Sequence, residues 1–467
     1  MNTQIGDRAV VIGASMAGLL AAHVLADSYG EVMVIDRDDL PVTPMHRRGV
    51  PHGRHLHALA GRGQQVLEEL LPGLTADLVT CGAPVGDLLG DARLYLSGHR
   101  LRRAHSGLVL LCASRPLLEG HVRARIRARP NVRLVDRCDV VGLVATPDGR
   151  RVIGARVLRH ADGSAEELID ADLVVDAGGR GSRAAAWLDV LGHPRPESDR
   201  VQIGLGYATR TYRLPPDVLD GDLAALIAAT PRHPRTGAIQ RLEGDRWMVT
   251  LAGILGDHPS TQPDRFLEFA RSLQFPDIHD AIQDAEPLDA PVPFRFPASV
   301  RHRYERQRSP AGFLVIGDAV CSFNPVYGQG MTVAALEALT LRRHLTRGSE
   351  PQSARWFRDL ARLVDVPWQM AAGGDLMFPG VEGRRTRKIR LMSTYIVRLH
   401  GAASRDARLA TAFARVVGLV SPPQSLLHPA ITLRVLRGGR HPARPRPTVA
   451  SSTPTRPGSP HMADEST

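Results

Sequence analysis

The stretch that most constrains the fold is residues 8–36, RAVVIGASMAGLLAAHVLADSYGEVMVID, near the start of the 467-residue chain. A short apolar run, AVVI, is followed by a glycine-rich turn, a helix-like segment and a second apolar run. Strand, tight turn, helix and strand in this order are typical of a βαβ unit, whose two strands lie parallel in one sheet. The sequence therefore predicts an α/β fold with a parallel sheet.

The turn of this unit, GASMAG, matches the dinucleotide fingerprint G-x-G-x-x-G at Gly13 and Gly18, but Ser15 stands at the second glycine. Asp36 ends the next predicted strand, where a carboxylate can bind the two ribose hydroxyls of a dinucleotide and disfavours a 2′-phosphate. The pattern predicts a site for FAD or NAD rather than NADP. The alternative is a glycine turn that only permits close packing of the helix.

A second motif, GDAVCSFNPVYGQG, follows the apolar run GFLVI and precedes a predicted helix that begins near Met331. Asp318 stands where the strand ends, and Pro325, Gly328 and Gly330 lie in the turn. An NAD site does not need this late segment, whereas an FAD stretched across a sheet needs a second anchor for its ribityl chain and ring. The helix start would direct N–H groups to the flavin edge that gains negative charge on reduction. We therefore expect FAD, with Asp318 on the ribityl hydroxyls rather than acting only as a turn carboxylate.

The remaining segments differ in their hydrophobic pattern. Residues 131–176 alternate in short runs separated by turn signals, which predicts a β-meander returning to a buried strand. Residues 201–213 and 238–254 predict long strands of a second, mostly antiparallel sheet, and the run at 312–319 predicts a return to the parallel sheet. The sequence thus predicts a first domain assembled from separated pieces with a second domain inserted.

The expected fold class is a discontinuous Rossmann-type FAD-binding domain with an inserted, mostly antiparallel substrate sheet and a C-terminal helical region. The expected division is as follows: residues 1–80, 106–190 and 301–345 form the FAD-binding domain, 81–105 and 191–300 the substrate domain, 346–440 the helical region, and 441–467 a disordered tail rich in Pro, Ser and Thr.

Several motifs resemble those of the single-Rossmann flavoprotein monooxygenases, the class of para-hydroxybenzoate hydroxylase and squalene epoxidase. The chain most resembles the actinobacterial polyether epoxidases of the lasalocid and monensin type. The resemblance runs through most of residues 8–345 and is carried by these motifs: RRGVPHGRHLHAL (47–59), LEELLPG (67–73), SRPLLE (114–119), LVVDAGGRGSR (173–183), GYATR (206–210) and GDAVCSFNPVYGQGM (317–331). These motifs are specific to the superfamily and not to one substrate.

The resemblance implies which residues hold FAD and which line the substrate pocket. The expected cofactor-binding residues are Gly13, Ser15, Gly18, Asp36, Arg37, Arg54, Arg115, Asp318, Pro325, Gly328, Gly330 and Met331. The candidate pocket residues are His57, Tyr207, Arg210 and Trp247, for each of which ordinary packing is the alternative. The flavin itself carries the chemistry, so no catalytic side chain and no metal is assigned.

One departure from the superfamily concerns the electron donor. Many aromatic hydroxylases of this class carry an Asp-Gly pair in the segment matching DAGGRGSR, but Gly178 takes the place of that aspartate here. The sequence also has no second strand-linked G-x-G-x-x-G motif. Electrons are therefore expected either from transiently bound NAD(P)H or from a separate flavin reductase.

The activity implied by the resemblance is FAD-dependent monooxygenation of an apolar small molecule with O₂. We expect epoxidation of a polyketide or terpenoid alkene in secondary metabolism ahead of aromatic hydroxylation. The alternatives are an FAD-dependent reductase or desaturase of isoprenoid double bonds and a non-catalytic FAD carrier. Halogenation is disfavoured because the single lysine, Lys388, lies outside the flavin-binding segments and no W-x-W-x-I-P segment is present.

Composition excludes several other classes. The formal net charge of +11 comes almost entirely from arginine scattered along the chain, without a zinc-finger or RNA-binding signature, so nucleic acid is not an expected partner. The four cysteines show no CxxC pair or metal-ligand spacing. The chain has no apolar leader and no run near the roughly 18 apolar residues of a membrane span, so we expect a cytoplasmic protein without stable membrane insertion. Peripheral membrane contact through the C-terminal third stays open.

Overall fold

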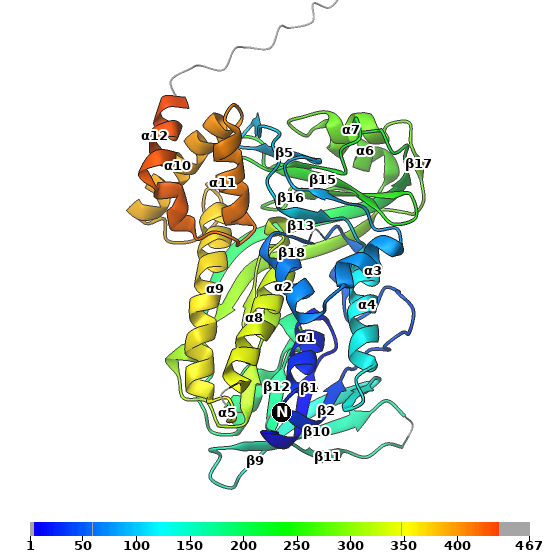
Figure 1. The fold of residues 1–467 in the computed structure, drawn as a ribbon, viewed down its shortest axis with the longest axis vertical. Helices are drawn as coiled ribbons and strands as arrows, with labels where there is room; N and C mark the ends of the chain where they lie inside the picture. Colours follow the sequence, from blue (N-terminus) through cyan, green and yellow to red (C-terminus); the bar gives the residue numbers. More distant parts are fainter. Residues whose placement is uncertain (1–3, 58, 162, 347, 439–467) are drawn as a thin grey trace, which may run out of the picture.

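The computed structural model describes residues 4–57, 59–161, 163–346 and 348–438. Its lower half, as seen in Figure 1, contains a five-stranded parallel sheet in the order β19–β12–β1–β2–β8. The strands are β1 (Gly6–Ile12), β2 (Tyr29–Ile35), β8 (Val132–Val135), β12 (Leu173–Asp176) and β19 (Phe313–Val315). Strands β12 and β19 are buried throughout, as expected for parallel strands covered on both faces. The predicted βαβ unit and the late parallel strand are therefore present.

Helix α1 (Met16–Leu25) connects β1 to β2 and lies against α8 (Gly330–Leu345) and α4 (Arg115–Arg127). Gly18 allows the first turn of α1 to lie close to the glycine turn before it, because a Cβ there would lie 1.8 Å from the carbonyl oxygen of Gly13. The predicted meander forms a three-stranded antiparallel sheet of β9 (Cys138–Ala145), β10 (Val152–Arg159) and β11 (Glu167–Asp170), which contacts β12.

The second large sheet has nine strands and is mostly antiparallel. Its strands are β5 (Ala92–Leu96), β6 (His99–Arg100), β13 (Ser198–Arg213), β14 (Ala224–Ile227), β15 (Arg235–Leu242), β16 (Arg246–Gly253), β17 (Glu286–Pro287), β18 (Val292–His302) and β20 (Cys321–Ser322). The stretch 238–254, expected as one long strand, is instead a hairpin of β15 and β16. Gly244 and Asp245 adopt positive φ angles of 72° and 53° in its turn.

The two faces of this sheet contact different parts of the molecule because side chains alternate along each strand. Tyr212 and Trp247 are paired across β13 and β16 and belong to an apolar cluster with α6 (Pro263–Arg271) and α7 (Asp277–Ile282). Tyr207 belongs instead to the cluster that includes the parallel sheet. The Tyr207 face is therefore the one turned toward the first domain.

The remaining elements complete the connections. A small sheet joins β3 (Leu59–Ala60), β7 (Val109–Leu111) and β4 (Val85–Asp87), and the short helices are α2 (Arg62–Leu70), α3 (Leu74–Thr80) and α5 (Ala184–Val190). The 3₁₀ turns are η1 (Pro51–Arg54), η2 (Gly179–Gly181), η3 (Tyr304–Arg306), η4 (Gly317–Ala319), η5 (Pro325–Tyr327) and η6 (Pro423–Leu427).

The region after residue 346 is helical, as expected. Helix α9 (Ser353–Asp375) runs beside α8 toward a group formed by α10 (Arg387–Ala403), α11 (Ala407–Val417) and α12 (Pro429–Gly438) (Figure 1). Within the described residues, none of the helices has the length and apolar character needed to cross a bilayer. The predicted disordered tail at 441–467 lies outside the described residues. The observed architecture is the expected α/β fold of a Rossmann-type domain, an inserted β-sheet and C-terminal helices.

Candidate active site

The sequence-predicted residues gather where loops leave the carboxyl ends of the parallel strands, which is where open α/β sheets bind ligands. The loop after β1 carries Gly13 and Ser15, the loop after β2 carries Asp36, and the turn after β19 carries Asp318. Arg115 reaches the same region from the first turn of α4. Residues widely separated in the sequence thus form one candidate site.

The first part of the site is the glycine turn before α1. Gly13 adopts a positive φ of 97°, and a Cβ there would lie 2.7 Å from the carbonyl oxygen of Ala177. The Asp36 carboxylate accepts a hydrogen bond from the Ala14 N–H at 2.6 Å, which fixes the turn against the end of β2. Ser15 is the N-cap of α1, but its side chain does not cap the helix. Backbone N–H groups in the first turn of α1 are therefore available to an anionic ligand.

A buried group of charges lies beside this turn. Arg47 forms ion pairs with Asp36 at 2.8 Å and with Glu119 at 2.8 Å, and it donates a hydrogen bond to the Ala14 carbonyl at 2.9 Å. Arg115 donates to the Ser15 hydroxyl at 2.9 Å and pairs with Glu119 at 3.0 Å. Burial alone would raise the pKa of Glu119, but the charges of Arg115 and Arg47 hold it below its ordinary value. Neither Arg47 nor Glu119 is among the site residues predicted from the sequence, although both lie in motifs that carry the family resemblance.

Asp318 occupies the turn η4 at the end of β19. Burial raises its pKa to about 6, against the opposing charges of Arg180 and Arg115. Its carboxylate accepts no hydrogen bond from any described residue, so its oxygens are free to bind a ligand. The turn is held against α8, because the Gly317 N–H donates a hydrogen bond to the buried carboxyl of Glu337 at 2.6 Å.

The glycine loop after Asp318 leads into the first turn of α8. A Cβ added at Gly328 or Gly330 would meet no described atom within 4 Å, so this backbone borders open space. Gln329 is the N-cap of α8 but its side chain makes no capping hydrogen bond, which leaves the first N–H groups of a sixteen-residue helix available. The expected positions of Pro325 in η5 and of Met331 in α8 agree with the structure.

A buried polar group ties this loop to α9. Asp375 accepts hydrogen bonds from the Asn324 amide at 2.8 Å and the Tyr327 hydroxyl at 3.0 Å, both through Oδ1. Its Oδ2 is buried without a partner among the described residues. Burial raises the pKa of Asp375 to about 6, although the two hydrogen bonds lower it.

The other wall of the candidate site, across from the glycine turn and the loop that carries Asp318, consists of aromatic rings and histidines. The Tyr207 ring lies 5.1 Å from Phe294 and 4.6 Å from His55, measured between ring centroids, and Arg180 lies 5.8 Å from the centre of Phe294. His55 is hydrogen-bonded to Thr209 at 2.8 Å. Arg180 connects this wall to Asp318 electrostatically.

The histidines of η1 and the following segment stay neutral at ordinary pH. Burial is the largest cause in each case: it lowers the pKa of His57 to about 4 and that of His55 to about 3, with further lowering by Arg115 and by His57, respectively. His52 lies 5.6 Å from His57 between ring centroids, and burial also holds its pKa well below the ordinary value. These rings therefore present neutral surfaces, in keeping with an apolar ligand.

The prediction that Trp247 and Arg210 line the pocket is wrong. Trp247 is fully buried in the cluster under α6 and α7, opposite Tyr212. Arg210 is paired across the sheet with Val249 of that same cluster, and its guanidinium lies 5.5 Å from the Tyr212 ring. Both point to the far face of the sheet, whereas Tyr207 points to the histidines. Alternation along a strand predicts two faces but does not say which of them meets the other domain.

Two further predicted residues lie at the margin of the site. Arg37 and Arg54 are exposed, and Arg54 ends η1 near His46, whose pKa its charge lowers in addition to burial. Arg180, in the motif LVVDAGGRGSR, and Phe294 also belong to the site but are not among the residues predicted from the sequence. The alternating sequence VPFRFP was the available signal for Phe294.

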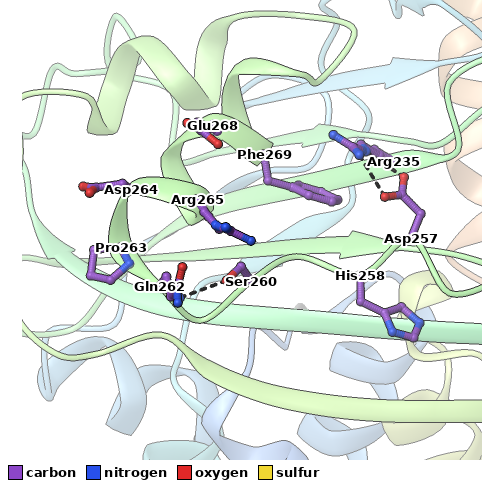
Figure 2. Close-up of a pocket in the computed structure, with 10 residues that line it drawn as sticks. All are labelled: Arg235, Asp257, His258, Ser260, Gln262, Pro263, Asp264, Arg265, Glu268 and Phe269. Atoms are coloured by element: carbon purple, nitrogen blue, oxygen red, sulfur yellow. Dashed lines mark hydrogen bonds and ion pairs between the residues drawn. The ribbon is translucent and has the colours of Figure 1, made fainter.

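A separate polar hollow of about 710 Å³ lies on the other face of the inserted sheet, next to α6 (Figure 2). Its lining includes Arg235, Asp257 and Arg265, and Arg235 forms an ion pair with Asp257 at 2.7 Å. His258, which also lines the hollow, packs over Gly206, on the opposite side of β13 from Tyr207. This hollow is therefore not part of the candidate active site.

Comparison with known proteins identifies the family. Residues 8–350 match the family described as "FAD binding domain". The chain is 39% identical over 397 residues to Protein Rv3254 of Mycobacterium tuberculosis, covering 80% of this chain and 81% of that protein. It is 26% identical over 386 residues to kynurenine 3-monooxygenase of Salinispora tropica, covering 76% of each. The structure of the flavin-dependent brominase Bmp2 superposes with a TM-score of 0.66 at 15% identity, covering 92% of this chain and 98% of that one.

The geometry agrees with this family. Free N–H groups at the starts of α1 and α8, open space at Gly328 and Gly330, and the unpaired Asp318 carboxylate suit an extended ligand with a diphosphate and several hydroxyls. The chain belongs to the FAD-binding-domain family within the single-Rossmann flavoprotein monooxygenase superfamily, and its cofactor is FAD.

Proposed function

We propose that FAD extends from the glycine turn of α1 to the first turn of α8. Gly13, Ser15 and Gly18 would receive the diphosphate, and Asp36 the adenosine ribose. Asp318 would accept hydrogen bonds from the ribityl hydroxyls, and the backbone at Gly330 would face the flavin ring. Support comes from the free N–H groups of both helices and from the unpaired carboxylate of Asp318.

The proposed activity is insertion of one oxygen atom from O₂ into a small, mainly apolar substrate. Bound FAD, once reduced, supplies the oxygen-activating chemistry. This chain's own residues would exclude water and hold the substrate between the α8 start and the wall of Tyr207 and Phe294. The observation that carries the proposal is the position of Arg180 between the proposed cofactor anchor and the aromatic wall. Its positive charge lowers the pKa of Asp318, and its guanidinium lies 5.8 Å from the centre of the Phe294 ring.

An alkene of polyketide or terpenoid type is the proposed oxygen acceptor. In the wall, His55, Thr209 and Thr250 form a hydrogen-bonded chain with distances of 2.8 and 2.7 Å, whereas Nε2 of His55 is buried without a partner among the described residues. Support for an apolar acceptor comes from the packed rings of Tyr207 and Phe294, which would contact it without requiring hydrogen bonds from it. Incubation with reductant, isotope-labelled O₂ and a panel of polyene substrates should give epoxides with one labelled atom. Labelled product from phenols or anilines alone would reject the alkene.

Aromatic hydroxylation is the second candidate. It is supported by the two kynurenine 3-monooxygenases among the relatives and by the neutral ring of His57, which can accept a hydrogen bond from a phenol or aniline. Under this alternative, His57→Gln should raise the KM for an aromatic substrate while FAD affinity stays the same. An unchanged KM would remove the role of His57.

The electron donor is proposed to be NAD(P)H bound transiently or a separate flavin reductase. Stopped-flow reduction of the FAD-loaded protein by NADH and NADPH distinguishes the two. Saturable reduction means direct use, whereas reduction only after addition of a flavin reductase means a partner. A reduced flavin that reacts slowly with O₂ in the presence of substrates would instead support a reductase or desaturase.

A further inference from the structure

The net charge of the chain is concentrated in its C-terminal helices. Residues 382–438 contain eleven Arg and Lys residues but only two acids, so this segment carries +9 of the formal +11. Residues 1–381 contain 44 basic and 44 acidic residues and are formally neutral. The expectation that the positive charge is scattered along the chain is therefore wrong, because the excess of basic over acidic residues lies mostly in this one segment.

The first half of α10 combines cations with an exposed leucine. Leu391 is 75% exposed, and Arg387, Lys388 and Arg390 around it are exposed as well. These three cations make no hydrogen bond or ion pair with any side chain in the described part of the molecule. They therefore play no visible part in holding the helices together.

The outer face of α12 continues this pattern. Leu433 and Leu436 are 47% and 52% exposed, and the preceding Leu427 is 49% exposed. Helices α10 and α12 are in contact. Two hydrogen bonds join adjacent segments: Tyr395 of α10 donates to the Leu426 carbonyl in η6 at 2.5 Å, and Arg405, just after α10, donates to the Gly438 carbonyl at the end of α12. We call Arg387, Lys388, Arg390, Leu391, Leu427, Leu433 and Leu436 the α10–α12 surface.

Figure 1 shows that α10 and α12 stand at one end of the molecule, beyond the end of α9. Leucines at the centre of an arginine-rich helical face are typical of helices that lie in a membrane interface, where apolar side chains enter the acyl boundary and cations meet anionic headgroups.

Other occupants fit the α10–α12 surface less well. A second copy of the chain would bring the same positive field against itself, which opposes association. Nucleic acid would match the charge but not the exposed leucines. No Phe, Tyr or Trp in the described residues 382–438 is exposed for base stacking.

We propose that the α10–α12 surface docks the protein onto an anionic lipid bilayer, without spanning it. The cations supply long-range attraction, and the exposed leucines enter the interface. This proposal does not depend on the oxygen acceptor, since it concerns a surface outside the candidate active site.

The test is co-sedimentation of the full chain with vesicles of phosphatidylcholine alone or mixed with phosphatidylglycerol. Binding to the mixed vesicles should be strong at low salt and weak to phosphatidylcholine alone. The triple variant R387Q/K388Q/R390Q should lose about five-fold in partition coefficient per cation, or about 100-fold in all. The variant L391S/L433S/L436S should also weaken binding, because it removes the inserted apolar groups while keeping the charge.

The matched control removes three exposed cations elsewhere, in R200Q/R265Q/R355Q, and should retain binding. Thermal unfolding of each variant checks that its fold is kept. If the control variant loses as much vesicle binding as R387Q/K388Q/R390Q, binding depends on the total charge of the protein and not on the α10–α12 surface, which would overturn the proposal. Absence of binding to anionic vesicles would overturn it as well, as would tight binding to duplex DNA that the leucine variant leaves unchanged.

Discussion

A substitution at Asp375 provides a quantitative test of the buried carboxyl that holds the loop before α8 in place. Its Oδ1 accepts both hydrogen bonds from the loop, while Oδ2 is buried without a partner among the described residues. In the variant Asp375→Asn the side-chain carbonyl can accept the same two hydrogen bonds. The substitution therefore removes a buried negative charge and keeps the contacts.

The expected effect depends on pH. The folded protein raises the pKa of Asp375 from 3.8 to about 6, so the folded state binds its proton more tightly than the unfolded state. This contribution to stability is fully present below the unfolded pKa and is lost as pH rises through the folded one. The shift corresponds to a total loss of about 3 kcal/mol by about pH 8. Asp375→Asn does not incur this loss.

Urea unfolding of wild type and variant at about pH 5 and about pH 8 measures the difference. The quantity compared is the free energy of unfolding of Asp375→Asn minus that of wild type. This difference should be about 1.5 kcal/mol larger at about pH 8 than at about pH 5. The exposed carboxylate in Asp284→Asn is the matched control and should leave the pH dependence unchanged. Parallel pH dependences for wild type and Asp375→Asn would refute the assignment of a buried, titrating carboxyl at this position.

Three further substitutions test other parts of the account. Asp318→Ala should weaken FAD binding about 10- to 100-fold, since charge-assisted hydrogen bonds to the ribityl hydroxyls are lost, while the far-UV circular dichroism stays the same; unchanged affinity in a fluorescence titration would reject this ribityl anchor. Gly18→Ala should destabilise the protein by about 3 kcal/mol because its Cβ would overlap the Gly13 carbonyl, and an unchanged urea midpoint would contradict that packing. Trp247→Ala should cost about 3–5 kcal/mol of stability without changing FAD affinity, because Trp247 lies in the cluster under α6 and α7; selective loss of substrate binding would return it to the pocket.

Local patterns were sufficient to predict much of the fold. The βαβ unit follows from two apolar runs separated by GASMAG, and the strand before Asp318 follows from GFLVI with a glycine turn after it. Both signals lie within a few tens of residues, where strand, turn and helix chemistry act directly. The late strand β19 could therefore be assigned to the parallel sheet in spite of its distance along the chain.

The candidate site was harder to predict from the sequence than the fold, because it depends on contacts between segments that are distant along the chain. Asp375 meets Asn324 across 51 positions, and Arg180 meets Phe294 across the domain boundary. No spacing rule connects such residues. The misplacement of Trp247 has the same origin, because the choice between the two faces of a strand is made by the packing of α6 and α7 and not by the strand's own sequence. The roles assigned to the FAD-binding residues remain predictions.

The most direct test of the central claim is the reaction of the reduced protein with O₂. The FAD-loaded protein is reduced without oxygen, mixed rapidly with oxygenated buffer and followed through its flavin absorbance. A monooxygenase of this family should show a transient spectrum distinct from those of both reduced and oxidised flavin before reoxidation is complete. Slow, featureless reoxidation, unchanged by alkene or aromatic substrates, would contradict the proposed oxygen-inserting function.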